Sequence, residues 1–187
     1  MFSCENSIET RIEDFKVLNE VSRGGGIVFF GSNYFARMNV NELANDCEMF
    51  EKLYDRSVAG LLIADSFRML ESAVYDLNPA KIFVNIGDED CLQEDFNAEA
   101  FIEKYEWLLL NLHRGCKASK IYIVSVVSEA KVVPSINQRL HQLASDTGCT
   151  FIDIRSVAFE EYGFEKAFNM LKPYMRSFHV KFAQAMG

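Results

Sequence analysis

The sequence predicts one α/β domain, a three-layer α/β/α sandwich built on a five-stranded parallel sheet. Short apolar runs rich in β-branched and aromatic residues alternate with longer stretches of helical periodicity. Strands that alternate with helices in this way form a parallel sheet covered by helices on both faces. The 187 residues suit one domain with a sizeable core, and no Pro/Gly-rich linker divides them. We therefore treat 1–187 as a single domain, with 1–23 as an N-terminal helix packed on it.

Five segments have the composition of buried strands. The first, "IVFF", follows three consecutive glycines, and the third, "KIFVNIG", is apolar on both faces. A central strand of a parallel sheet is buried on both faces, so such a continuous apolar run is expected there. In chain order, the predicted strands are 27–30, 52–57, 81–87, 120–127 and 149–154.

The segments between these strands carry apolar residues three and four positions apart, a spacing that lines one face of a helix. Ile8, Ile12 and Phe15 follow it in the first segment. Asn39 with Glu42 is the pattern of a capping box, which marks a helix start. The predicted helices are about 6–21, 39–46, 60–77, 97–113 and 134–147, followed by two more, the last beginning near Pro173.

Charge and composition exclude several classes of function. The net charge is -8, which argues against nucleic acid or an anionic membrane as partner, because phosphate binding needs a basic surface. No stretch is long and apolar enough to span a membrane, and the N-terminus lacks the apolar region of a secretion signal. The five cysteines are scattered without a C-x-x-C pair, which favours reduced thiols. We expect a cytoplasmic protein without a cofactor or metal ion.

Ligand sites in parallel sheets lie beyond the carboxyl ends of the strands. That rule selects four segments of this chain. They are Gly31-Ser32-Asn33, the turn near Gly60, the run 87–90 and the loop after the fifth strand.

Taken together, these segments resemble the SGNH (GDSL-type) hydrolase family, which has a flavodoxin-like α/β fold. The stretch "FFGSN" matches the family's first block, a strand ending in Gly-Asp-Ser, and "YDRSVAG" matches its second block. The stretch "VNIGDED" takes the place of the third block, Gly-x-Asn-Asp, and "NMLKPYMRSFHVKFA" that of the last, Asp-x-x-His. The resemblance covers most of the chain and implies this fold, with ester hydrolysis as the family's activity.

The resemblance also implies where a catalytic site would lie. In the family, the first-block serine is the nucleophile, and the last-block histidine is its base, oriented by an aspartate. The serine N–H, a second-block glycine N–H and a third-block asparagine amide form the oxyanion hole. At the nucleophile, glycine, asparagine, aspartate and histidine positions, this chain has Asn33, Gly60, Glu89, Asn169 and Lys172, respectively.

These replacements remove the standard chemistry. The carboxamide of Asn33 has no hydroxyl with which to attack. Glu89 places negative charge where negative charge must develop, and losing one oxyanion donor typically costs about 3 kcal/mol. Lys172 cannot accept a proton unless its pKa is strongly lowered. We therefore predict a domain without Ser-His-Asp ester hydrolysis that keeps a pocket for binding or interaction, at the positions Gly31, Asn33, Gly60, Glu89 and Asn169.

Three alternatives remain at this stage. Ser32 with Lys172 as base would make an esterase or acylhydrolase with a rearranged site. Glu89 and Lys172 would form an ion pair in place of the missing catalytic groups. The acidic run 88–90 would bind Mg²⁺ or Ca²⁺.

His113, His141 and His179 are all expected on helices away from the site. A small-molecule ligand or an ester substrate is the expected partner.

Overall fold

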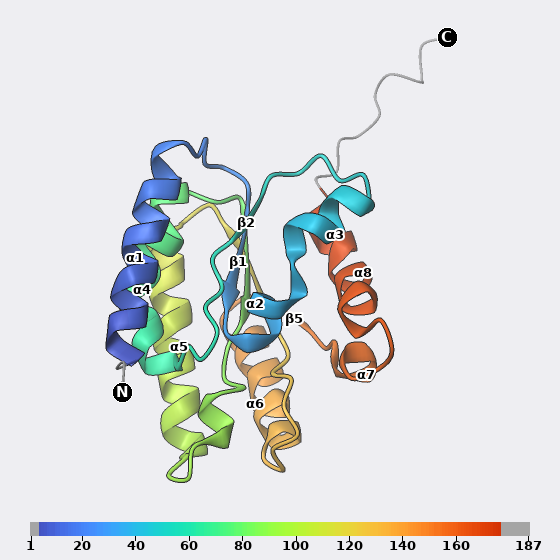
Figure 1. Cartoon of the computed structure of the whole chain (residues 1–187). Coiled ribbons are helices and arrows are strands. Elements are labelled where there is room, and N and C mark those ends of the chain that lie inside the picture. The colour runs from blue at the N-terminus through green and yellow to red at the C-terminus, as the bar shows by residue number, and fades with distance from the viewer. Residues whose placement is uncertain (1–3, 177–187) are drawn as a thin grey trace.

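The computed structural model describes residues 4–176, with side chains from Ile8 onward. Its centre is a five-stranded parallel sheet with strand order β2-β1-β3-β4-β5 (Figure 1). The strands are β1 (Ile27–Gly31), β2 (Leu53–Asp55), β3 (Lys81–Asn85), β4 (Lys120–Val124) and β5 (Thr150–Ile152). Each overlaps its predicted segment, so the predicted parallel sheet is confirmed.

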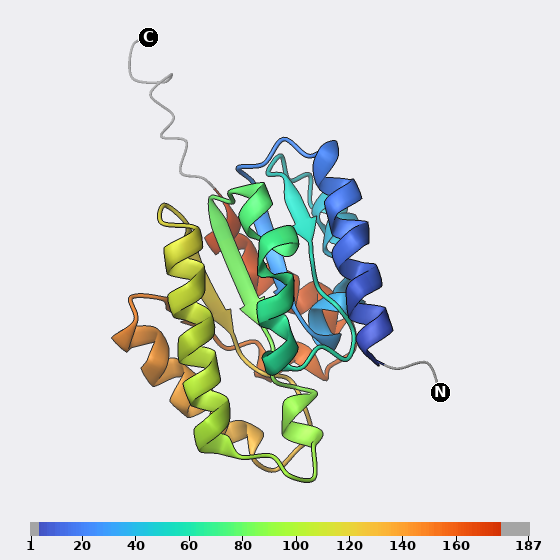
Figure 2. The ribbon, with the colours of Figure 1, turned by 90° about the vertical axis from the view of Figure 1, so that its left-hand side faces the viewer.

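Helices cover both faces of this sheet (Figures 1 and 2). The face that carries Val28 and Phe30 packs against one set of helices, and the face that carries Phe29 and Phe83 packs against another. The first set is α1 (Cys4–Glu20), α4 (Ile63–Ala73), α5 (Ala98–Gly115) and α6 (Val133–Asp146). The second set is α2 (Asn33–Met38), α3 (Val40–Asp46) and α8 (Gly163–Met175). Short helical turns η1 (Tyr75–Leu77), η2 (Asp90–Leu92) and α7 (Arg155–Ala158) complete the described chain.

The alternation of side chains along the strands produces the two cores. On one face, the rings of Phe29, Phe83 and Tyr122 from three neighbouring strands stack at centroid distances of 5.1 and 4.6 Å. On the other face, Ile8 and Phe15 of α1 are buried in the core. None of the helices between residues 4 and 176 is both long and apolar enough to cross a membrane.

The C-terminal helix differs from its prediction. It begins at Gly163, not near Pro173, which lies inside its last turn. A proline there removes only one late hydrogen bond of the helix. The last carbonyls are also bound: Nζ of Lys81, at the start of β3, donates to the carbonyl oxygens of residues 174, 175 and 176 at 2.8, 2.6 and 3.0 Å. The carboxyl end of α8 therefore lies at the amino ends of the strands.

Candidate functional site

The first part of the site is the end of β1, which is packed tightly against β3. The N–H of Ser32 donates to the carbonyl oxygen of Asn85 at 2.9 Å, and the N–H of Val58 donates to the carbonyl oxygen of Gly31, also at 2.9 Å. A Cβ at Gly31 would lie 2.0 Å from the Asn85 carbonyl oxygen, so only glycine fits. This backbone approach fixes where the chain turns from β1 into α2.

Asn33, the first residue of α2, links two loops of the site. Its Oδ1 accepts from the N–H of Gly60 at 2.8 Å, and its Nδ2 donates to Oε2 of Glu89 at 2.8 Å. Gly60 has a φ of 77°, in the left-handed region that favours glycine. The structure therefore brings together three predicted site residues that are far apart in sequence.

This bridge changes what the site can do chemically. An oxyanion hole needs backbone N–H groups that are free to bind developing negative charge. Here the Gly60 N–H already has an acceptor, the amide oxygen of Asn33. The carboxylate of Glu89 lies on the other side of the same amide.

Ser32 and Asp88 form the buried floor behind this bridge. Ser32 has no exposed surface and Asp88 is 6% exposed. Among the described residues, the Oγ of Ser32 and the Oδ1 of Asp88 have no hydrogen-bond partner. Burial raises the pKa of Asp88, and the neighbouring Ser32 and Asn33 side chains oppose this only in part. A fully buried hydroxyl is out of reach of a substrate carbonyl.

The acidic run 88–90 sends its three carboxylates in different directions. Asp88 faces the buried floor, Glu89 binds Asn33, and Asp90 accepts from the N–H of Ile63 at the start of α4, at 3.2 and 3.1 Å. Burial raises the pKa of Asp90 to about 6 in spite of that bond. Within residues 4–176, no three His, Cys, Asp or Glu side chains are grouped so that they could hold a metal ion. The run does not form the cluster that the metal alternative needs.

Lys172 and Asn169 are not brought to the site, which corrects their placement from the sequence. The amino end of α8 is near Asn33's helix, because the carbonyl oxygen of Gly163 accepts from the Tyr34 hydroxyl at 3.3 Å. Lys172 lies nine residues further on, roughly 13 Å along the axis at the helical rise, toward the opposite edge of the sheet. Asn169 is exposed on the same helix.

Two hypotheses fail on this placement. Ser32 and Lys172 lie near opposite edges of the sheet and do not form a dyad. Glu89 binds Asn33 instead, and no salt bridge of the described residues joins it to Lys172.

The two described histidines are engaged elsewhere. Nε2 of His113, in the last turn of α5, lies 3.5 Å from Sγ of Cys149. His141 of α6 stacks on the ring of Phe151 in β5, with a centroid distance of 5.2 Å. His179 lies outside the described residues.

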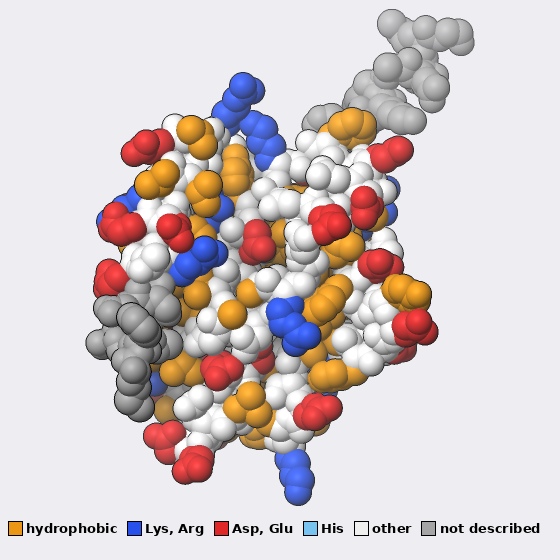
Figure 3. All heavy atoms as spheres, viewed as in Figure 1, with side chains coloured by type: hydrophobic (Ala, Val, Ile, Leu, Met, Phe, Trp, Pro, Cys, Tyr) orange, Lys and Arg blue, Asp and Glu red, His pale blue; other side chains and the backbone are white. Residues whose placement is uncertain are grey.

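A pocket of about 530 Å³ opens beside Asn33. Its far wall is the segment 158–165, which joins α7 to α8, and this wall was missed from the sequence because the last helix was predicted to begin ten residues too late. Phe159 and Tyr162 in this wall are 64% and 65% exposed. Figure 3 shows hydrophobic and acidic side chains on the surface of the molecule where α7 and α8 lie in Figure 1. The pocket is lined by Asn33, Tyr34, Arg37, Asp88, Val127, Ala158, Phe159, Glu160, Tyr162, Gly163, Phe164 and Glu165.

A signal for this wall was present in the sequence. Ala167, Phe168, Leu171 and Met175 are the buried residues of α8, and their spacing follows a helical face from just after Gly163. The glycine and the apolar periodicity after it would have placed the helix start correctly.

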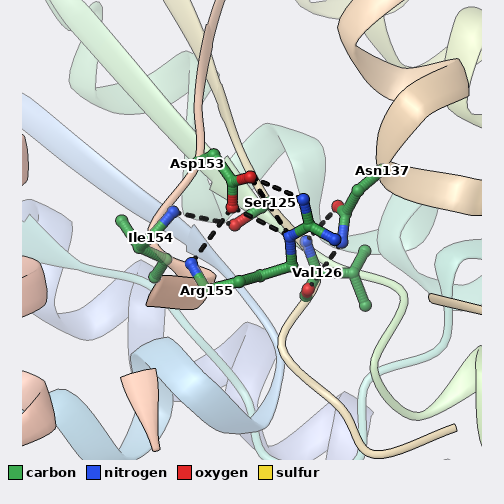
Figure 4. A network of polar contacts seen from close by, with 6 residues as sticks. All are labelled: Ser125, Val126, Asn137, Asp153, Ile154 and Arg155. Atoms are coloured by element: carbon green, nitrogen blue, oxygen red, sulfur yellow. Dashed lines mark hydrogen bonds and ion pairs between the residues drawn. The ribbon is translucent and has the colours of Figure 1, made fainter. Parts of the chain in front are cut away.

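A polar network supports the chain that leads into this wall (Figure 4). Asn137 of α6 pairs through its amide with both backbone groups of Val126, at 2.8 and 2.9 Å. Oγ of Ser125 accepts from the N–H of Ile154 at 3.0 Å. Asp153 binds Arg155, with an Oδ2–Nη2 distance of 2.6 Å, and this bond holds the pKa of Asp153 below its usual value. The loops after β4 and β5 are thereby held together.

No protein-family model matches the sequence, and no curated protein matches it. Solved structures do match. A Streptococcus pneumonia protein assigned provisionally as a platelet activating factor is 18% identical, with a TM-score of 0.78 over 92% of this chain and 96% of that one. A GDSL-like lipase from Bacteroides thetaiotaomicron is 13% identical, with a TM-score of 0.74 over 88% and 96%.

An acetylxylan esterase from Geobacillus stearothermophilus is 13% identical, with a TM-score of 0.64 over 82% of this chain and 95% of that one. Each of these similarities covers nearly the whole of the other chain. At such low identity, they establish the fold. This chain has the α/β fold of SGNH/GDSL-like hydrolase structures, with a five-stranded parallel sheet flanked by helices.

Proposed function

We propose that this chain binds a small molecule in the pocket beside Asn33 and does not hydrolyse esters by the Ser-His-Asp mechanism. The observation that carries the proposal is the bridge made by Asn33. Its amide stands at the nucleophile position and binds both the Gly60 N–H and the Glu89 carboxylate, each at 2.8 Å. One group thus replaces the nucleophile and occupies an oxyanion donor.

The neighbouring groups support the same reading. Ser32 is the hydroxyl closest in sequence to the lost nucleophile, but it is fully buried. No histidine is among the described residues that line the pocket. Acyl transfer by a serine needs an accessible hydroxyl with a base in hydrogen-bond reach.

The pocket itself supports a binding role. Its volume of about 530 Å³ lies in the range of small-molecule sites, roughly 300–1,000 Å³. It lies beyond the carboxyl ends of the strands, where ligands of parallel sheets bind. The GDSL-like lipase and the acetylxylan esterase with this fold are named for activity on esters. In the present chain, we propose that the pocket persists without that chemistry.

The test combines labelling with turnover. The wild-type protein, Ser32→Ala and Asn33→Ser are incubated with a serine-directed fluorophosphonate and analysed by intact mass, and each is assayed with p-nitrophenyl acetate. An active acetylxylan esterase is the positive control. We expect no adduct and no turnover above the buffer rate for the wild-type protein. An adduct that maps to Ser32, with turnover that disappears in Ser32→Ala, would overturn the proposal.

Asn33→Ser sharpens the result. It restores a hydroxyl at the nucleophile position and frees the Gly60 N–H, yet it supplies no base. We expect little or no turnover from it, because a nucleophile without a base is weak.

A further inference from the structure

We propose that Cys149 is a modification site, a thiol that small hydroperoxides oxidise to a sulfenic acid with His113 as the base. Cys149 directly precedes β5, at the amino end of the sheet, whereas the pocket beside Asn33 lies beyond the carboxyl ends of the strands. The inference is therefore independent of the proposed function. Three features of the described residues carry it.

The first feature is the pairing of a thiol with an imidazole. Sγ of Cys149 lies 3.5 Å from Nε2 of His113, and both side chains are partly exposed. A nucleophile and a base within hydrogen-bond reach are the arrangement that activates thiols in enzymes, and such contacts are often longer before a substrate binds. A neutral imidazole accepts a proton through its unprotonated nitrogen, so Nε2 can take the thiol proton.

The second feature is the place of His113 in its helix. It lies in the last turn of α5, a helix of 18 residues. The carboxyl end of a helix carries partial negative charge and stabilises a cation, so the imidazolium that forms when His113 takes a proton is favoured there. This matters because burial raises the pKa of Cys149, and the thiol therefore needs a base to become a nucleophile.

The third feature is a buried hydroxyl group. Tyr105 of α5 has no exposed surface, and its hydroxyl oxygen has no hydrogen-bond partner among the described residues. Burial raises the pKa of Tyr105, and charge on Cys149 raises it further, so the two groups interact electrostatically. A hydroxyl dipole without another acceptor is available to stabilise negative charge that develops at the sulfur.

The oxidation step balances with the peroxide as the oxidant. His113 takes the thiol proton, and the sulfur attacks the terminal oxygen of the peroxide, so that the S–O bond forms as the O–O bond breaks. The leaving hydroxide or alkoxide takes the proton from His113 and departs as water or an alcohol. The sulfur loses two electrons to the peroxide, and the product is a sulfenic acid, which reaction with a thiol can reverse.

Two other interpretations of the pair explain less. A metal ion would need further ligands, and no three His, Cys, Asp or Glu side chains among residues 4–176 are grouped to hold one. An S–H···N bond with a purely structural role would fix the end of α5 against the start of β5. It would account for the contact, but not for the buried hydroxyl of Tyr105 that lacks a partner.

The experiment measures oxidation at each cysteine. The reduced full chain is treated with hydrogen peroxide in the presence of dimedone, which traps sulfenic acids, and the adducts are mapped by mass spectrometry over time. Cys47 is the internal control, because it is also a free, partly exposed thiol and has no histidine bonded to it among the described residues. We expect Cys149 to be trapped at least about ten times faster than Cys47, since a positioned base typically contributes about a hundredfold or more.

Variants separate a base from a structural contact. His113→Gln keeps a polar side chain that cannot take a proton, and it should slow trapping at Cys149 by about tenfold or more. His141→Gln is the matched control: it removes the ring that stacks on Phe151 in β5 and should leave the rate unchanged. Tyr105→Phe should slow trapping several-fold without a loss of stability, because it removes a buried hydroxyl that has no partner among the described residues.

Three outcomes would overturn the inference. The first is trapping at Cys149 no faster than at Cys47, a comparison within the wild-type protein that needs no variant to fold. The second is an equal rate in His113→Gln and the wild-type protein, both folded by circular dichroism, which would leave the contact as a structural bond. The third is equal slowing in His113→Gln and His141→Gln, which would mean that both act through the packing of β5.

Discussion

The two walls of the pocket are built in different ways. The wall at Asn33 is held from behind, by the backbone contacts of Gly31 at the end of β1 and by the Asn33 amide bridge to Gly60 and Glu89, with two bonds of 2.8 Å. The opposite wall, residues 158–165, presents exposed aromatic rings and includes Tyr162 in a left-handed conformation with a φ of 59°. The first wall is fixed by the core of the protein, and the second is shaped by a surface segment.

This difference indicates a division of roles. A rigid strand-end wall preserves the position of a site even where its chemistry changes. A surface segment tolerates substitution and sets what the site binds. Substitutions in the first wall should therefore act mainly on stability, and substitutions in the second mainly on ligand binding.

The largest effect should come from Gly31→Ala. The added Cβ would lie 2.0 Å from the carbonyl oxygen of Asn85, so the β1–β3 pairing must shift. We expect a loss of at least about 3 kcal/mol in the free energy of unfolding, measured by urea denaturation. Gly60→Ala is the matched control. Its Cβ would meet nothing within 4 Å, so only the left-handed φ should count, at about 1 kcal/mol. Equal losses for the two variants would contradict the packing account.

Asn33→Ala should come next. It removes the acceptor of the Gly60 N–H and the donor to Glu89, and we expect a loss of about 2 kcal/mol. Phe159→Ala on the opposite wall should change stability by less than about 0.5 kcal/mol, because the ring is 64% exposed. A thermal or urea denaturation series that ranks Phe159→Ala above Asn33→Ala would reverse the assignment of the walls.

A pH series on Asp90 tests the loop after β3, in which Asp90 directly follows the Glu89 that binds Asn33. Its pKa is raised by burial from 3.8 to about 6, so the folded state holds the proton more tightly than the unfolded state. The stability from this group is complete below about pH 3.8 and is lost as the pH rises through 6. Asp90→Asn should remove about 1–2 kcal/mol of that fall between pH 4 and pH 7.

The loss of stability between pH 4 and pH 7 should not vanish entirely in Asp90→Asn. The pKa of Asp88 is also raised by burial and gives the same sign, and the charge of Asp88 itself raises the pKa of Asp90. The positive charge of Lys104 acts on Asp90 in the opposite direction. Identical denaturation profiles for wild type and variant across this range would show that Asp90 titrates normally.

The smallest effect should be a gain. Tyr162 is 65% exposed and has a φ of 59°, a conformation that costs a non-glycine residue about 1 kcal/mol. Tyr162→Gly should therefore raise the free energy of unfolding by about 0.5 kcal/mol, which a slightly higher melting temperature would show. Glu161→Gly, at the neighbouring position without a positive φ, should lower stability by a similar amount, because glycine loses more backbone entropy on folding. A loss in Tyr162→Gly would mean that its ring contributes more to packing than its exposure indicates.

The same contrast explains which parts of the molecule could be predicted from sequence. Strands buried on both faces produce continuous apolar runs, so all five strands and the residues at their ends were located. The convergence of Asn33, Gly60 and Glu89 followed from those strand ends. The direction of the side chains in the acidic run depends on contacts with α2 and α4, which leave no pattern in the sequence.

The far wall was not predicted, for a physical reason. Pro173 favours the first turn of a helix, and this preference predicts that the last helix begins near it. The proline is tolerated in the last turn because it removes only one late hydrogen bond of the helix there. The apolar periodicity that begins just after Gly163 is the stronger signal for the start of α8, and Asn169 and Lys172 were misplaced together with that start.

The hydrogen bond from the Gly60 N–H to Asn33 can be followed by hydrogen exchange. An amide hydrogen that is hydrogen-bonded exchanges slowly with solvent deuterium, at a rate set by local opening. In a loop between a strand and a helix, such protection is traceable to the single side chain that provides it. The exchange rate of the Gly60 amide therefore measures how often its bond to Asn33 opens, and a change in that rate on addition of a ligand would report binding beside Asn33 without any label.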